Sequence, residues 1–161
     1  MDCDYFIVPA ACDYFSTRAL KTLGHSIANW IRDWDIISKL APNDVPRLTG
    51  RPVYLGYVLQ RFRMYGGSIS SVYRHYARQL DRHSYSDVAA VLQDVDEELA
   101  LGSLSQFKLG QIKDFMTLAN LAQRQGTAIS LVDGGAQYQK EEAETAFKEF
   151  AMKVIARIEG L

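Results

Sequence analysis

The chain is poor in cysteine, with only Cys3 and Cys12 among its 161 residues, and it has no C-x-x-C pair or cysteine–histidine cluster. This shortage excludes a disulfide framework and a zinc site of the usual spacing. The two cysteines flank an expected strand, and an extended strand separates Cα atoms too far for a bridge. We therefore expect two free thiols, as in a protein of the reducing cytosol.

Long apolar runs and excess charge are also missing. No run approaches the roughly 18 apolar residues of a membrane span, and the start, Met1 to Asp4, lacks the basic segment of a signal peptide. The formal net charge of -1 excludes a strong overall attraction to nucleic acid or to an anionic membrane. Only a local patch of charge is left for such a role.

The sequence also lacks the motifs of phosphate transfer and acyl transfer. No glycine-rich loop ends in Gly-Lys-Ser or Gly-Lys-Thr, and neither Gly66-Gly67 nor Gly134-Gly135 is followed by such a pair. Binding a triphosphate needs a row of backbone N–H groups at a helix N-terminus and a lysine. No serine lies in a G-x-S-x-G elbow. We predict that this chain alone does not hydrolyse ATP, and we identify no catalytic residue and no metal ligand.

The residues that are present predict a single α/β domain over residues 1–161. Hydrophobic residues make up 48% and charged residues 23%, as in globular domains. Apolar runs of strand length alternate with helical periodicity, which favours parallel pairing in a layered sheet. We expect strands at 5–8, 53–59, 104–107 or 111–113, and 128–132. We expect five helices: from a Ser16 N-cap past Trp34, from Ser68 or Ser70 to His83, from Ser86 or Asp87 to Leu99, at 116–125 and at 137–158. We also expect a loop from Pro42 through Pro46 to Gly50, and a break in the chain at Gly66-Gly67.

Four segments carry a shared pattern in chain order. They are Cys3–Pro9 followed by Asp13, Phe15-Ser16, Ala19-Leu20 and Leu23-Gly24; Leu55–Arg61; Leu109–Phe115 followed by Leu118, Leu121–Gln123 and Gly126; and Ala128–Leu131. Together these segments resemble the C-terminal half of the ParA/MinD-type partition ATPases, a family with a deviant phosphate loop. The match covers most of the chain, but that loop and the switch regions are not in it.

This resemblance implies a fold and a cellular role. The fold would be a three-layer α/β/α domain with a mostly parallel sheet, an incomplete form of the doubly wound phosphate-loop NTPase fold. In the intact family, ATP and magnesium join two protomers, the dimer binds DNA or membrane, and a ParB-like partner triggers hydrolysis. The implied process is partition of a plasmid, chromosome or other cargo in a bacterial cytoplasm, at the nucleoid.

Three polar residues are candidates for the base or ribose side of a nucleotide site. Ligands of open α/β sheets lie beyond the carboxyl ends of the strands, and Gln60 ends an expected strand. Lys113 and Asp114 share that edge if a strand ends at residues 111–113. The alternative is that Gln60 only ends a strand and that Lys113 and Asp114 are a solvated pair.

A basic cluster is the candidate DNA-binding surface. It consists of Arg61, Arg63, Arg74, Arg78 and Arg82, within a stretch whose one acid is Asp81. Arg74, Arg78 and Arg82 recur every four residues, so they share one helix face and repel one another. Such a stripe can contact phosphates. The alternative is that the stripe pairs with the acidic run of Asp94, Asp96, Glu97 and Glu98.

A second function of another class stays open. The chain begins as if inside a larger sheet, so an edge strand with apolar flanks would be left uncovered. Proteins usually cover such edges. The alternative prediction is therefore a non-catalytic interaction module that forms a homo-oligomer through its exposed sheet edge.

Overall fold

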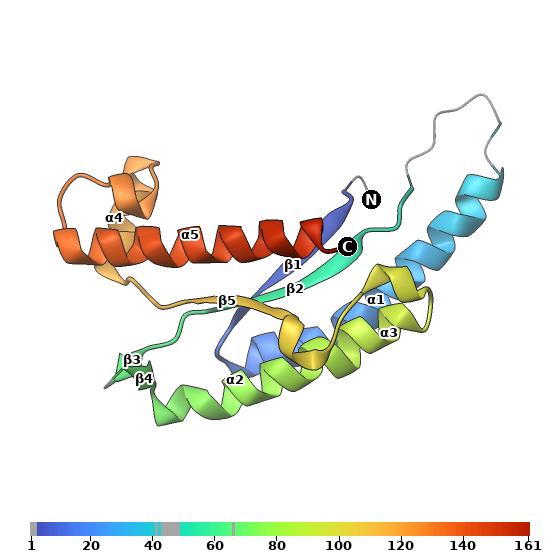
Figure 1. The fold of residues 1–161 in the computed structure, drawn as a ribbon, viewed down its shortest axis with the longest axis horizontal. Helices are drawn as coiled ribbons and strands as arrows, with labels where there is room; N and C mark the ends of the chain where they lie inside the picture. Colours follow the sequence, from blue (N-terminus) through green and yellow to red (C-terminus); the bar gives the residue numbers. More distant parts are fainter. Residues whose placement is uncertain (1–2, 41, 43–48, 66) are drawn as a thin grey trace.

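The centre of the molecule is a parallel sheet of three strands with helices on both faces (Figure 1), which confirms the expected α/β class. This computed structural model describes residues 3–40, 42, 49–65 and 67–161. The strand order is β1-β2-β5, and β3 and β4 form a separate antiparallel ribbon. In chain order the elements are β1 (Tyr5–Ala11), α1 (Tyr14–Leu40), β2 (Val53–Gln60), β3 (Met64–Tyr65), β4 (Ser68–Ile69), α2 (Ser71–His83), α3 (Ala90–Gln93), β5 (Lys108–Ile112), α4 (Thr117–Gln125) and α5 (Gln137–Glu159).

Strand β2 lies in the middle because both of its faces are apolar. Every residue from Tyr54 to Leu59 is buried, as expected of a continuous hydrophobic run in a parallel sheet. Within β2, Gly56 has φ +141°, and a Cβ there would lie 2.2 Å from the carbonyl oxygen of Phe107. Only glycine therefore allows the close approach of the two chain segments at this point.

Two hydrophobic cores cover the two faces of the sheet. Helix α1 and the α2–α3 rod bury the larger one, around Tyr54, Tyr57 and Phe107. Helices α4 and α5 bury a smaller one, around Val58 and Leu118. Helix α5 packs on β5 and on β2 (Figure 1). Burying two apolar faces in this way is what a layered α/β arrangement provides.

The residue that caps the N-terminus of α1 differs from the prediction. Asp13, rather than Ser16, caps the helix, since its Oδ1 accepts a hydrogen bond from the Ser16 N–H at 2.7 Å. The Ser16 hydroxyl instead accepts from the Ala11 N–H at 3.1 Å. The side chains of Asp13 and Ser16 thus join the end of β1 to the first turn of α1.

The two helices expected between residues 68 and 99 are one continuous rod, so the break between them was wrong. A π-helical turn, Ser84–Ala89, links α2 to α3. No glycine or proline occurs from Ser71 to Ala100 to interrupt the rod. Ser84, the first residue of the π turn, is buried, and its hydroxyl lies 2.8 Å from the Tyr54 hydroxyl. The rod ends at Gln93, so Leu99 lies in a separate 3-10 turn, Glu97–Leu99.

One strand prediction was wrong, and one of two alternatives for another was wrong. Residues Leu104–Gln106 form a 3-10 turn, and the strand is β5, which overlaps only the second expected range, 111–113. Residues Ile129–Leu131 form another 3-10 turn in place of a strand at 128–132. The Gln125 side chain closes this segment into a loop, because it bonds both the N–H (2.8 Å) and the carbonyl oxygen (3.0 Å) of Asp133.

Two predictions concern segments that lie partly or mostly outside the described residues. The loop from Pro42 through Pro46 to Gly50 lies mostly outside the described residues, and so does Gly66 of the expected break. Gly50 itself is described and has φ +63°. A Cβ at Gly50 would lie 2.0 Å from the Trp34 ring, so this glycine packs directly against the indole of α1.

Candidate functional site

A cavity of about 580 Å³ lies at the carboxyl ends of β2 and β5. It holds all three residues predicted for the nucleotide side, together with Arg61 from the basic cluster. We call it the carboxyl-edge cavity. It is lined by Gln60, Arg61, Ile112, Lys113, Asp114, Phe115, Met116, Ala119, Asn120, Gln123, Ile129 and Phe147.

The two strands bring Gln60 and Asp114 to the same edge. Gln60 is the last residue of β2 and pairs with Ile112 of β5. The segments stay together for two more residues, because the Asp114 N–H donates to the Phe62 carbonyl oxygen at 3.1 Å. Phe62 is 2% exposed and anchors this extension in the core. Asp114 was expected beside Gln60 only if a strand ended at residues 111–113. Strand β5 ends at Ile112, so this condition is met.

The loop walls of the cavity have an unusual backbone. Arg61 has φ 54° and Met116 has φ 42°, a region that costs a non-glycine residue about 1–3 kcal/mol. The Asp114 carboxylate supports this geometry, because its Oδ1 accepts from the Met116 N–H at 2.9 Å. The other carboxylate oxygen has no hydrogen-bond partner in the described part of the chain and is free to accept from a ligand.

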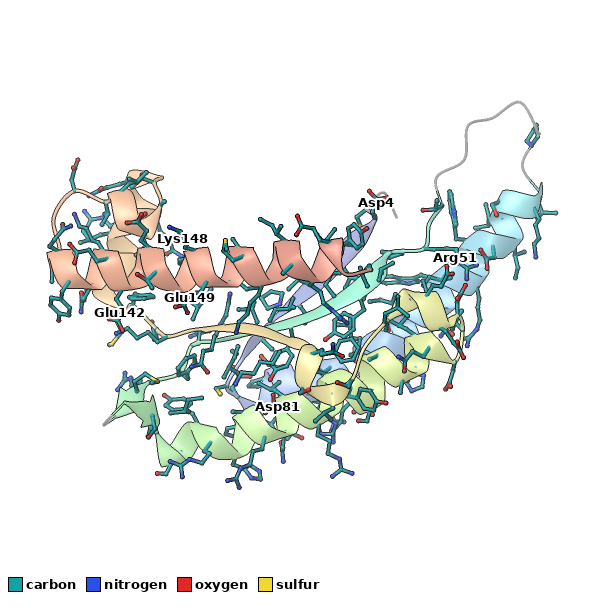
Figure 2. All side chains as sticks on the ribbon, viewed as in Figure 1. Asp4, Arg51, Asp81, Glu142, Lys148 and Glu149 are labelled. Carbon is teal, nitrogen blue, oxygen red and sulfur yellow. The ribbon has the colours of Figure 1, made fainter. Side chains whose placement is uncertain are left out.

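Lys113 is tied to α5. Its Nζ lies 2.5 Å from Oε2 of Glu142 and 5.3 Å from the centroid of the Phe115 ring. Figure 2 shows Glu142 on the part of α5 near the end of β5. A paired ammonium adds little attraction for an anion. The main role of Lys113 at the cavity is therefore to link the end of β5 to α5.

Two amide side chains that line the cavity were not predicted from the sequence. Asn120 and Gln123 of α4 line it, one helical turn apart. The only signal was their i,i+3 spacing on a helix that begins soon after a strand end. With Gln60, they give this cavity three amide groups, each of which donates and accepts hydrogen bonds.

An apolar groove of about 980 Å³ adjoins the cavity along α4 and α5. The two share Ala119, Gln123, Ile129 and Phe147. Phe147 is 43% exposed, so a large aromatic face is open to a ligand. Amide groups beside an exposed ring suit a flat, polar heterocycle, which needs stacking on its faces and hydrogen bonds at its rim.

The basic cluster divides in two. Arg61 lines the carboxyl-edge cavity, and Arg63 precedes the β3–β4 ribbon. Arg74, Arg78 and Arg82 lie exposed along α2 and form what we call the arginine stripe. The Arg74 Nη2 donates to the Ile69 carbonyl oxygen at 3.5 Å, and within the described ranges no carboxylate lies within 4 Å of a stripe guanidinium.

Two acids close to the stripe in sequence, Asp81 and Asp96, have other partners. Asp81 lies on the sheet side of α2 (Figure 2) and accepts a hydrogen bond from the Tyr57 hydroxyl. Asp96 of the acidic run pairs with Arg51 at 2.5 Å. The pairing of the stripe with the acidic run is therefore not found among the described residues. Burial and the Asp81 carboxylate both raise the pKa of Tyr57 well above its usual range.

Other kinds of site are not seen in the described ranges. No three histidine, cysteine or acidic side chains gather there as metal ligands. In the part of the chain that the structure covers, no helix is long and apolar enough to cross a bilayer.

No family model matches the sequence, and no characterised protein or solved structure is significantly similar to it.

Proposed function

We propose that this chain supplies the base and ribose side of a nucleotide site, as the C-terminal part of a ParA-like partition ATPase. The observation that carries the proposal is the carboxyl-edge cavity, in which Gln60 and Asp114 meet beside an exposed Phe147 ring. The position agrees with the rule for ligands of open parallel sheets. The resemblance in sequence supports the same assignment.

The lining of the cavity supports a site for the base and ribose of ATP rather than for its magnesium triphosphate. The Gln60 amide can bond the rim of a base, and the free oxygen of Asp114 can accept from a ribose hydroxyl. Lys113 is already paired with Glu142, and the sequence offers no phosphate loop. On this proposal the chain binds the nucleoside part of ATP weakly and performs no hydrolytic step by itself.

Calorimetry with ATP and magnesium, ATP alone, and adenosine tests this assignment. We expect weak binding of all three with affinities within about threefold of one another, since an anion site would add more than 1.4 kcal/mol, or tenfold. The variant Asp114→Asn keeps an acceptor for the Met116 N–H but removes the charge, and it should weaken adenosine binding. Gln60→Ala should do the same.

The matched control is Gln111→Ala, on an exposed position of β5 outside the cavity. It should leave adenosine binding unchanged. Binding of ATP that is at least a hundredfold tighter than that of adenosine would contradict the proposal, because it requires a phosphate site. Undetectable binding of adenosine would remove the nucleoside assignment itself.

The partner side of the proposal rests on the arginine stripe. We propose that Arg74, Arg78 and Arg82 contact DNA phosphates without sequence preference, as expected of a partition protein at the bacterial nucleoid. Three aligned guanidinium groups without a carboxylate repel one another, and phosphates relieve that repulsion. The ParB-like activator and the ATP-linked dimer remain part of the proposal.

A second candidate function is a non-catalytic module that forms homo-oligomers. It is favoured by β1, whose one partner among the described strands is β2, and by a series of large apolar side chains that α1 leaves exposed. These are Tyr14 56%, Phe15 83%, Trp30 56%, Ile36 59%, Ile37 56% and Leu40 80%. Exposed apolar surface of this extent commonly marks an interaction site.

A further inference from the structure

Arg157, near the C-terminal end of α5, has two buried donors without acceptors. Its Nε and Nη2 atoms are shielded from solvent and have no hydrogen-bond partner among the residues that the structure describes. These two nitrogens form the edge of the guanidinium that takes two oxygens of one carboxylate or phosphate. A buried, charged donor without a partner is costly, so an acceptor is expected.

The slot that holds Arg157 is built by its neighbours. The guanidinium carbon lies 5.5 Å from the centroid of the Phe107 ring, which supports it by a cation–π contact. Gly102 makes room at its edge, because a Cβ there would lie 2.5 Å from Nη2. The nearby Gln106 Oε1 already accepts from the Ser103 N–H at 2.6 Å and the Ser103 hydroxyl at 3.0 Å. Burial lowers the pKa of Arg157 below its usual range.

A cavity of about 450 Å³ opens beside this slot, lined by Arg157, Lys153, Ser105 and Gln106 among others. Lys153 lies one turn before Arg157 on α5, and no ion pair involves either residue in the described ranges. The cavity lies at the start of β5, whereas the carboxyl-edge cavity lies at its end. The two sites are therefore separate.

We propose that this second cavity is an oxyanion site, in which Arg157 and Lys153 bind a carboxylate or phosphate group of a small anionic ligand. Arg157 supplies the two-pronged contact, and Lys153 adds a point charge at the rim. Because Nε and Nη2 are shielded in the structure, binding of the anion requires the guanidinium to turn toward the cavity. No step of the nucleotide proposal depends on this site.

Thermal unfolding of the full chain in potassium phosphate and in potassium succinate tests the proposal, with potassium chloride at equal ionic strength as the reference. At least one of the two anions should raise the Tm in a saturable way, and the more effective arm identifies the preferred group. Arg157→Lys keeps the charge but loses the fork, so the apparent affinity should fall about tenfold or more. Lys153→Gln, at an exposed position, should lower the affinity severalfold.

Lys148→Gln is the matched control, since it removes the same charge from α5 at the apolar groove (Figure 2). It should leave the anion response unchanged. The proposal is overturned if neither anion exceeds chloride with the wild-type chain. It is also overturned if Lys153→Gln, Lys148→Gln and the wild-type chain respond alike, a result that does not depend on how well an Arg157 variant folds.

Discussion

Cys12 shows how a single buried group responds to its surroundings. The residue is 4% exposed, and its thiol donates to the Tyr73 carbonyl oxygen at 3.5 Å. Burial raises the pKa of this thiol to about 11, against the attraction of Lys108. A thiol without thiolate character does not react, because the thiolate is the nucleophile. Cys3, in contrast, is exposed.

We predict that the raised pKa of Cys12 lowers stability at alkaline pH. The unfolded thiol ionises near pH 9.0 and the folded one near 11, so rising pH favours the unfolded chain. Between pH 8 and pH 10 the free energy of unfolding should fall by about 1 kcal/mol more in the wild type than in Cys12→Ala.

Denaturant titrations at the two pH values measure this difference, and Cys3→Ala serves as the control that keeps the wild-type slope. A thiol reagent at pH 8 should label one cysteine in the native chain and two in denaturant. Equal pH dependence in all three proteins would show that Cys12 ionises in the folded state as readily as in the unfolded one.

The helices illustrate how close contact between elements depends on one small residue. Gly24 of α1 packs against the π turn, and a Cβ there would lie 2.0 Å from the Asp87 carbonyl oxygen. Backbone atoms cannot move aside as a flexible side chain can. The contact between α1 and the π turn therefore requires glycine, although glycine weakens a helix interior by about 0.5–1 kcal/mol relative to alanine.

The variant Gly24→Ala should thus destabilise the protein despite its better helix propensity. Overpacking of a core typically costs about 1–3 kcal/mol, which exceeds the gain in propensity. Urea unfolding measures the change, with Lys21→Ala on the exposed side of the same helix as a neutral control. A Gly24→Ala protein as stable as the wild type would mean that α1 does not pack on the π turn in solution.

The arginine stripe is also a property of one element, since α2 alone presents it. Replacing Arg74, Arg78 and Arg82 by alanine should weaken binding to any duplex DNA. It should lower the slope of log K against log salt concentration by about 1 per lost phosphate contact. Fluorescence anisotropy with two unrelated duplexes, at several salt concentrations, gives both quantities.

The matched control replaces Arg18, Lys21 and Lys39, three exposed cations of α1, and removes the same total charge. DNA binding should persist in this variant. If both triple variants lose affinity equally, the attraction is one of total charge and the stripe has no special role. If neither variant loses affinity, the arginine stripe does not contact DNA.

At the scale of the whole molecule, the sheet has two edges that no described strand pairs with, and the β1 edge is partly protected. Asp4 and Cys12 bond their backbone to β2, so the odd-numbered residues between them direct their N–H groups outward. Among these, Pro9 has no N–H, and the Ala11 N–H is bonded to the Ser16 hydroxyl. Proline at an edge discourages strand addition.

We therefore expect any homo-oligomer to form through the exposed apolar residues of α1 rather than along the full length of β1. Sedimentation equilibrium should show concentration-dependent association of the wild-type chain. Trp30→Glu, at a position 56% exposed, should shift the chain toward monomer, whereas Tyr5→Lys, at an exposed position of β1, should not. A monomer at every concentration would remove the oligomeric module, and dissociation by Tyr5→Lys alone would return the interface to the edge.

The amino-acid sequence by itself determined the elements whose pattern is local. Strand β2 followed from one continuous apolar run, α1 and α5 from long helical periodicity, and the end of α4 from Gly126. The position of Gln60 at a strand end also followed, since it needs only the boundary of β2. Periodicity and breaker residues act over a few positions, which is why they can be recognised without the fold.

Only the tertiary structure decided the features that join distant segments. An apolar run at 128–132 looked like a strand, but Gln125 bonds to Asp133 and closes it as a turn. The π turn depends on Tyr54 and Gly24, which lie far away in sequence. The pairing of Lys113 with Glu142, the meeting of Asn120 and Gln123 with Gln60, and the slot of Arg157 all depend on how α4 and α5 pack on the sheet. Such contacts are fixed by packing across the chain, and no local pattern records them.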